Sequence, residues 1–258
     1  LTRMNIGARW SLLLIATGGM ERSLRGNYRN PMRKRLITAL GLALIGVPAI
    51  VFGGMFYYLL LGTFLIGAAW EYVHLFRVVK LEPQMYITVG GVALVTFTRM
   101  FFRIYAQPAF AISILVAMAY HLIIYERGRD QSALDFALTI GGITYIGWIG
   151  SYLLELRNLP EGGWWLMLVM FCVWAGDSGA YSIGRAYGKH KIAPRLSPKK
   201  SWEGYIASIF TGMITGGFYV WVFKTFGSLT SDITIWQGAI MGLLLGALPT
   251  LGDLGESM

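Results

Sequence analysis

Long apolar runs separated by short polar segments recur along nearly the whole chain. Most runs reach or approach the about 18 residues that an α-helix needs to cross the hydrocarbon core of a bilayer. These runs are apolar all round, so they do not fit amphipathic helices on a protein surface. In lipid the backbone hydrogen bonds can be satisfied only by helices or a closed barrel, and we expect helices. The pattern predicts an all-α, polytopic integral-membrane bundle with about eight transmembrane helices, at residues 36–53, 56–76, 85–102, 108–125, 133–154, 163–184, 204–226 and 233–251.

Composition and charge fit a membrane protein rather than a nucleic-acid-binding one. Hydrophobic residues make up 55% of the chain and charged residues 14%, whereas about a quarter of the residues of a soluble domain are charged. The net charge of +9 is divided by side of the membrane: with residues 33–35 in the cytoplasm, thirteen Lys and Arg fall on that side and four on the other. The positive-inside rule then places residues 185–203 in the cytoplasm, and we expect an integral protein of the cell membrane with this segment on the inner side.

The N-terminal segment, residues 1–31, differs from the rest. Its short apolar run, residues 10–20, is flanked by arginines, and its length fits an interfacial helix or a signal sequence better than a span. We expect one basic N-terminal extension at 1–31 and one transmembrane domain at 32–258. The single cysteine, Cys172, falls within a predicted span, so no intrachain disulfide is expected.

The predicted span at 163–184 contains an acid, which is costly in a membrane and therefore indicates a functional site. Asp177, Tyr181 and Arg185 are spaced i, i+4 and i+8, so they share one face of a helix, with Ser178 beside them. The alternative is an ion pair at the end of the helix. We interpret this face as part of a pocket at the cytoplasmic side.

A basic loop follows, in which two prolines, Pro194 and Pro198, prevent one continuous helix. Ser197-Pro198 with Glu203 downstream predicts a turn into a new helix, whose first amides could receive phosphate oxygens. A solvated loop that attracts anionic lipid is the competing interpretation. The basic residues of this loop are Lys189, Lys191, Arg195, Lys199 and Lys200.

Other polar residues within the spans give weaker signals. Asp253 and Glu256 follow a glycine-rich span and could hold Mg²⁺, although acids are ordinary at an exposed helix end. Glu71 and His74 are spaced for a local hydrogen bond, which is as good an explanation as a site. His121 is expected to be a satisfied packing residue, because three scattered histidines do not form a zinc site.

Two of these stretches, "GDSGAYSIGRAYGKHKIAPRLSPKKSWEG" at 176–204 and "GDLGESM" at 252–258, resemble the phosphatidate cytidylyltransferase, or CDP-diacylglycerol synthase, family. The likeness runs from Met32 to the end of the chain. The first motif is the more specific, because its elements occur in the order and spacing of the family. Ser201 stands where a threonine is usual, which keeps the hydroxyl group.

The resemblance implies transfer of a cytidylyl group from CTP to phosphatidate, giving CDP-diacylglycerol and pyrophosphate for phospholipid synthesis. It implies Asp177, Lys200 and Asp253 as catalytic residues and Asp177 and Asp253 as ligands of Mg²⁺, with room for a second metal such as K⁺. The expected partners are CTP, phosphatidate and membrane lipids, with a homodimer allowed and no nucleic acid. Substrate-binding roles are expected for Ser178, Tyr181, Arg185, Lys189, Ser197, Lys199 and Glu203.

In one respect the sequence departs from the family pattern. The family continues beyond the Gly-Asp-Leu element to a Pro-Gly-His-Gly-Gly turn and a final pair of aspartates, whereas this chain ends at Met258. The second metal-binding acid implied by the resemblance is therefore not in this sequence. We expect this chain to be truncated and its site to be incomplete on its own.

Two further functions remain open from the sequence. One is a CTP-dependent enzyme that acts on an isoprenoid lipid, with similar nucleotide contacts and a different acceptor groove. The other is a transporter or a lipid-binding protein, since intramembrane acids alone would suit either. No inverted repeat is apparent that would favour a transporter.

Overall fold

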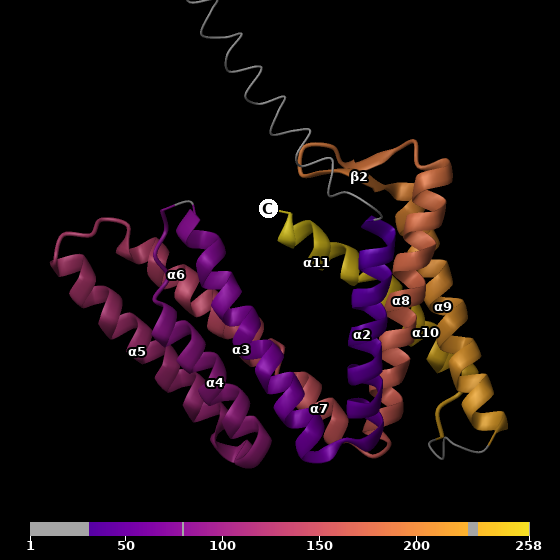
Figure 1. Ribbon diagram of the computed structural model, residues 1–258, viewed down its shortest axis with the longest axis horizontal. Coiled ribbons are helices and arrows are strands. Elements are labelled where there is room, and N and C mark those ends of the chain that lie inside the picture. The colour runs from indigo at the N-terminus through magenta and orange to yellow at the C-terminus, as the bar shows by residue number, and fades with distance from the viewer. Residues whose placement is uncertain (1–30, 79, 227–231, 258) are drawn as a thin grey trace, which may run out of the picture. The chain divides into compact units, whose positions relative to one another are not determined.

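The computed structural model describes residues 31–78, 80–226 and 232–257 (Figure 1). Contacts divide the chain into a unit of residues 1–47 and a unit of residues 48–258, and the site lies in the second. Apart from Pro31, the predicted N-terminal extension lies outside the described residues. Its interfacial placement therefore stays a prediction.

The described residues are almost entirely helical, with one small β-hairpin. In chain order the elements are α2 (Pro31–Phe52), α3 (Gly54–Val78), α4 (Met85–Phe101), the 3₁₀ turn η1 (Arg103–Tyr105), α5 (Ala106–Glu126), α6 (Ser132–Gly142), the π-helical η2 (Ile143–Ile149), α7 (Tyr152–Asn158), α8 (Gly162–Tyr187), β1 (Lys191–Ala193), β2 (Ser197–Ser201), α9 (Trp202–Thr225), α10 (Ile235–Ala247) and α11 (Pro249–Glu256).

The predicted all-α, polytopic membrane architecture is confirmed. Among the described residues, six helical segments are long and apolar enough to cross a membrane: Gly54–Val78, Arg103–Glu126, Ser132–Asn158, Gly162–Tyr187, Trp202–Thr225 and Ile235–Gly255. The other two predicted spans fall on shorter apolar helices. One is α4, with 17 residues, and the other is α2, whose apolar part described here is Ala43–Phe52.

The last predicted span, residues 233–251, is divided in two by a proline. α10 ends at Ala247, and α11 begins at Pro249, in the first turn of the new helix. Proline is well accommodated there because it lacks only an N–H that would be unpaired in any case. The consequence is that Asp253 lies on a short helix after this break, near the end of the apolar segment Ile235–Gly255.

The helices α8, α9 and α10 pack through glycines. A Cβ placed on Gly242 of α10 would lie 2.1 Å from the carbonyl oxygen of Gly212 on α9, so the two backbones are in direct contact. Ser208 of α9 adds a hydrogen bond, donated from Oγ to the carbonyl oxygen of Gly246 at 2.8 Å. Small residues of this kind let membrane helices approach closely. Glycines make similar close contacts between α8 and α9, the two helices that carry the hairpin between them.

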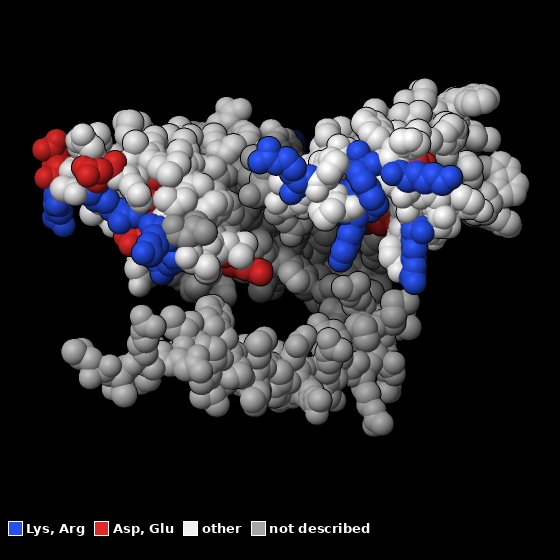
Figure 2. Space-filling model, turned by 90° about the horizontal axis from the view of Figure 1, so that it is seen from above, with Lys and Arg blue, Asp and Glu red and all other residues white. Residues whose placement is uncertain are grey.

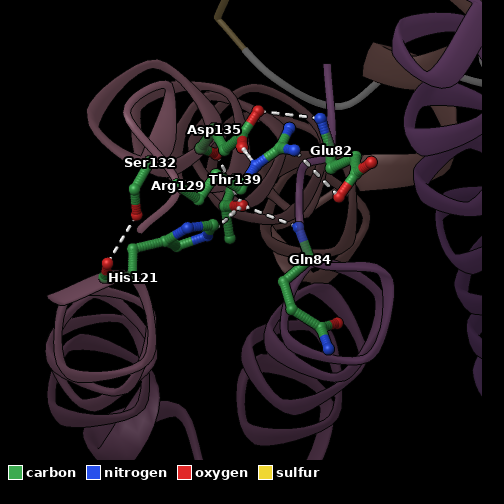
Figure 3. A network of polar contacts seen from close by, with 7 residues as sticks. All are labelled: Glu82, Gln84, His121, Arg129, Ser132, Asp135 and Thr139. Carbon is green, nitrogen blue, oxygen red and sulfur yellow. Dashed lines mark hydrogen bonds and ion pairs between the residues drawn. The ribbon is translucent and has the colours of Figure 1, made fainter. Parts of the chain in front are cut away.

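A second group of helices, α3 to α6, is joined by a buried polar network (Figure 3). Asp135, at 1% exposure, accepts a hydrogen bond from the backbone N–H of Glu82 at 2.7 Å. It also accepts one from Nε of Arg129, whose Nη1 lies 3.2 Å from a carboxylate oxygen of Glu82. The hydrogen bond that Arg129 donates to Asp135 raises the pKa of Arg129 above its ordinary value. Asp135 thus ties the α3–α4 connection to the α5–α6 connection.

His121 belongs to the same network, and its contacts define its tautomer. Thr139 Oγ1 donates to the carbonyl oxygen of Asp135 at 2.9 Å and accepts from the backbone N–H of Gln84 at 3.0 Å. The Thr139 proton is therefore used, so His121 Nε2, 3.1 Å from Oγ1, is the donor in that contact. His121 is buried and packed between helices as predicted, but it is only partly satisfied, because its Nδ1 has no hydrogen-bond partner among the described residues.

Replacing Asp135 with alanine is expected to destabilise the protein without touching the site. The substitution leaves the backbone N–H of Glu82 and Nε of Arg129 without their acceptor, at a cost of about 1–3 kcal/mol. The measurement is the apparent Tm of the detergent-solubilised protein. Glu82→Gln is the matched control, because this carboxylate is 63% exposed and its loss is expected to change the Tm little. Equal Tm shifts for the two variants would contradict the assignment.

Candidate active site

The C-terminal half of α8, as predicted, presents a polar face. Asp177, Tyr181 and Arg185 all line one cavity of about 650 Å³. Arg185 Nη1 donates a hydrogen bond to the hydroxyl oxygen of Tyr181 at 2.8 Å. Among the described residues Asp177 forms no salt bridge, so the alternative of a simple ion pair at the helix end is not what the structure shows. Its charge remains available to the cavity.

The basic loop folds into an antiparallel hairpin. β1 pairs with β2, with Lys191 opposite Ser201 and Ala193 opposite Ser197. The backbone N–H of Trp202 continues the pairing with a 2.9 Å hydrogen bond to the carbonyl oxygen of His190. A structured loop was predicted, whereas strands were not, because two prolines in so short a segment argue against a sheet.

The predicted new helix is present, and α9 begins at Trp202, two residues before the predicted span at 204–226, but Ser197 and Pro198 lie in β2 rather than in a turn. Ser201, rather than Ser197, is the N-cap of α9, and its Oγ accepts a hydrogen bond from the backbone N–H of Gly204 at 3.3 Å. Ser197 is instead the first residue of β2. The usual threonine hydroxyl at position 201 would serve the same cap, which explains why a serine suffices there.

Lys200 and Asp253 bring the hairpin and α11 together. Lys200 Nζ lies 3.0 Å from Asp253 Oδ2, across 53 residues of sequence. Asp177 is close enough to both to interact with their charges. The structure therefore gathers the three residues predicted to be catalytic at one place.

The cavity wall combines the α8 face, the hairpin, the first turn of α9 and α11. Basic side chains gather on the hairpin side of the upper face, whereas acidic and basic side chains are mixed near the α5–α6 connection (Figure 2). Of the predicted site residues, six line the cavity: Asp177, Tyr181, Arg185, Lys199, Lys200 and Asp253. Such a wall has two carboxylates and an excess of positive charge, which suits a polyphosphate bound with a cation.

Four predicted substrate-binding residues lie outside this wall. Ser178 Oγ donates to the carbonyl oxygen of Trp174 at 2.7 Å, within its own helix. Glu203 accepts hydrogen bonds from the backbone N–H and the ring Nδ1 of His190, the latter at 2.7 Å, and so holds the hairpin to α9. Lys189 and Ser197 are on the hairpin but not among the lining residues. Their substrate-binding roles stay predictions.

Several lining residues were not singled out from the sequence. Tyr205 follows Ser201 by one helical turn, and Thr250 precedes Asp253 by three residues on α11. Both spacings place the side chain beside a residue of the motif, which is the signal that could have identified them. Lys191 also lines the cavity, although no sequence pattern separates it from the other basic residues of the loop.

Outside the cavity, the Glu71–His74 hydrogen bond considered from the sequence is not formed. His74 Nδ1 lies 3.0 Å from the carbonyl oxygen of Trp70, and the His74 ring packs on the Trp70 ring. His74 therefore contacts the backbone carbonyl one helical turn earlier instead of the Glu71 side chain.

The residues of the cavity fit a magnesium ion. Mg²⁺ is usually held by one or two carboxylates and completes its coordination with water and substrate phosphate oxygens. Asp177 and Asp253 supply two such carboxylates on one wall. No cluster of three or more His, Cys, Asp or Glu is found in the described part of the chain, so a metal site made by protein ligands alone is not indicated there.

Comparison with known proteins gives a consistent assignment. The chain is 28% identical over 244 residues to the phosphatidate cytidylyltransferase of Mycobacterium bovis, covering 88% of this chain and 75% of that protein. It is 27% identical over 234 residues to the enzyme of the same name from Staphylococcus saprophyticus, covering 88% and 84%. A segment of 100 residues is 42% identical to the Haemophilus influenzae enzyme of that name, covering 38% and 34%. The pattern of the cytidylyltransferase family matches residues 33–258, and the chain belongs to that family.

Proposed function

We propose that this protein transfers the cytidylyl group of CTP to phosphatidate, forming CDP-diacylglycerol and pyrophosphate. The observation that carries the proposal is the single cavity in which Lys200, Asp177 and Asp253 meet. Family membership and relatives that bear the name phosphatidate cytidylyltransferase support the same reaction.

The reaction joins two anions, which explains the charges of the wall. A phosphate oxygen of the lipid attacks the α-phosphorus of CTP, the bond from that phosphorus to the bridging oxygen breaks, and pyrophosphate leaves. The repulsion between the reactants and the charge on the leaving group must be neutralised in a fixed in-line geometry. Lys199 and Lys200 are placed to contact the triphosphate, and Arg185 and Lys191 extend the positive wall.

Asp253 and Asp177 are the residues that would hold Mg²⁺. When bound, the ion neutralises phosphate charge and helps to orient the triphosphate. The two carboxylates cannot serve as phosphate contacts themselves, because they would repel the nucleotide. Their place on the wall is therefore best explained by a cation between them and the substrate.

The position of the cavity beside apolar helices suits a lipid acceptor. Ile192 and Tyr205 line it together with the charged residues, and α8 and α9 carry exposed apolar side chains along their length. The acyl chains of phosphatidate can then remain in the bilayer while the phosphate enters the polar wall. A membrane location of the enzyme follows from the insolubility of one of its substrates.

We propose a bacterial inner membrane location with the cavity facing the cytoplasm, where CTP and Mg²⁺ are available. α8 spans 26 residues, so the α7–α8 connection and the hairpin lie on opposite sides of the bilayer. The positive-inside asymmetry of the sequence places the hairpin inside.

Cysteine labelling is expected to show this orientation. Cys172 is fully buried, so it gives little background in Arg195→Cys on the hairpin and Leu159→Cys in the α7–α8 connection, both of which replace exposed residues. A membrane-impermeant maleimide added to spheroplasts should label Leu159→Cys, and should label Arg195→Cys only after permeabilisation. The reverse pattern would place the cavity on the outer face.

The proposed reaction is tested by supplying radiolabelled CTP and Mg²⁺ to the membrane-embedded enzyme with a panel of lipid acceptors. The expected product is CDP-diacylglycerol, formed from phosphatidate with stoichiometric release of pyrophosphate. Transfer only to isoprenoid phosphates or alcohols would assign a different acceptor. No nucleotidyl transfer to any lipid would leave a transporter or a lipid-binding protein as the function.

A further inference from the structure

Lys200 contacts a carboxylate in this structure, although its proposed partner in the reaction is a phosphate. Nζ lies 3.0 Å from Asp253 Oδ2, and the same nitrogen is shielded from solvent without a well-directed hydrogen bond to any described acceptor. Asp177, on the same wall, also interacts with the charge of Lys200. One ammonium group thus balances the two carboxylates that the proposed function assigns to Mg²⁺.

We propose that Lys200 is the resting counter-ion of Asp253 and Asp177, and that it exchanges these carboxylates for nucleotide phosphate when a divalent cation binds. The inference rests on the proposed function and adds a step that precedes the chemistry. Two carboxylates facing one cavity repel each other, and a positive charge nearby reduces that cost. An ammonium and a metal ion that neutralise the same carboxylates must compete.

The local structure allows this exchange without movement of the backbone. Lys200 directly precedes Ser201, the last residue of β2 and the N-cap of α9, which is 4% exposed and fixed by its hydrogen bond from the N–H of Gly204. The hydrogen bond from the backbone N–H of Trp202 to the carbonyl oxygen of His190 also ties this end of the strand to the residue before β1. Only the flexible four-carbon stem of the lysine has to rotate between carboxylate and phosphate.

The exchange couples the two ligands. A cation that takes over Asp253 releases the ammonium for the triphosphate, and a triphosphate that attracts the ammonium frees Asp253 for the cation. Because such coupling is reciprocal in free energy, each ligand is expected to strengthen the binding of the other. In the absence of both, Lys200 keeps the carboxylates neutralised.

The test is the affinity of the nucleotide-free protein for Mn²⁺, used as a spectroscopic substitute for Mg²⁺ and measured by electron paramagnetic resonance. In purified protein, Lys200→Met removes the competing charge and keeps much of the side-chain volume. It is expected to tighten Mn²⁺ binding by roughly five- to tenfold. Lys199→Met is the matched control: it removes the same charge from the same wall, but Lys199 forms no salt bridge among the described residues. Its effect should be under about twofold.

A double-mutant cycle then isolates the pair. With Asp253→Asn in the background, Lys200→Met should lose most of its tightening effect, because the carboxylate that the ammonium neutralises is gone. Unchanged or weaker Mn²⁺ binding in Lys200→Met, or an equal tightening in Lys199→Met, would overturn the proposal. If Lys200→Met does not give a monodisperse protein, Lys200→Gln provides the same measurement.

The result is separable from the fate of the proposed function. An enzyme that forms CDP-diacylglycerol, but whose Mn²⁺ affinity does not respond to Lys200→Met, would retain the function and reject the exchange. A protein that shows the tightening but transfers no cytidylyl group would retain the competition between lysine and cation and reject the reaction.

Discussion

Asp253→Asn is expected to reduce CDP-diacylglycerol formation to near background. The substitution keeps the size of the side chain and removes the negative charge that would hold Mg²⁺ in the cavity. Because even residues that only orient a metal ligand cost 10- to 100-fold when replaced, loss of a ligand charge should lower kcat/KM by more than about 100-fold. The concentration of Mg²⁺ needed for half of the remaining activity should rise.

The measurement is steady-state turnover over a range of Mg²⁺ concentrations in detergent or liposomes. Asp130→Asn is a suitable control, because it makes the same chemical change on an exposed residue that does not line the cavity. Membrane insertion and the apparent Tm should match the wild type in both variants, since Asp253 is itself 58% exposed. Near-normal turnover and Mg²⁺ dependence in Asp253→Asn would return this residue to a structural role within the short helix α11.

Lys200→Ala is expected to have the next largest effect. The ammonium is the best placed of the cavity's cations to reach a phosphate near the two carboxylates, and a single charged donor at a transferring phosphoryl group is worth about 2–4 kcal/mol of transition-state stabilisation. The kcat/KM for CTP should therefore fall by roughly 30- to 1000-fold. The hairpin fold should survive, because the residue is held by its neighbours rather than by its side chain.

Lys224→Ala controls for the loss of one positive charge, since Lys224 lies at the far end of α9 and is exposed. Its kcat/KM for CTP should stay close to that of the wild type. An unchanged kcat/KM in Lys200→Ala would assign the lysine to attraction of anionic lipid instead. When Lys200 is replaced, turnover should fall while the affinity for a divalent cation rises. A general loss of structure would not change the two quantities in opposite directions.

Features that depend on neighbours along the chain could be predicted without a structure. The apolar runs predicted the helices because length and hydrophobicity decide whether a segment can cross lipid. The shared face of Asp177, Tyr181 and Arg185 followed from the 3.6-residue period of a helix. The basic hairpin motif was recognisable because its residues are contiguous.

Local competition between nearby groups was harder to predict. Ser197 and Pro198 were predicted to form a turn before α9, but they begin β2, and Ser201 at the end of that strand caps the helix. Ser178 could have faced the cavity, and its hydroxyl instead bonds to its own helix. Each choice depends on small differences between alternative hydrogen bonds, which a sequence pattern does not resolve.

The convergence of distant residues was decided by packing. Lys200 and Asp253 meet because glycines let α9 and α10 pack in backbone contact and because Pro249 starts a new helix that returns Asp253 to the hairpin. The tie between Asp135 and Glu82 likewise joins residues 53 positions apart. Helix periodicity acts over a few residues, whereas these contacts depend on how whole helices approach one another, and that geometry is a property of the folded bundle.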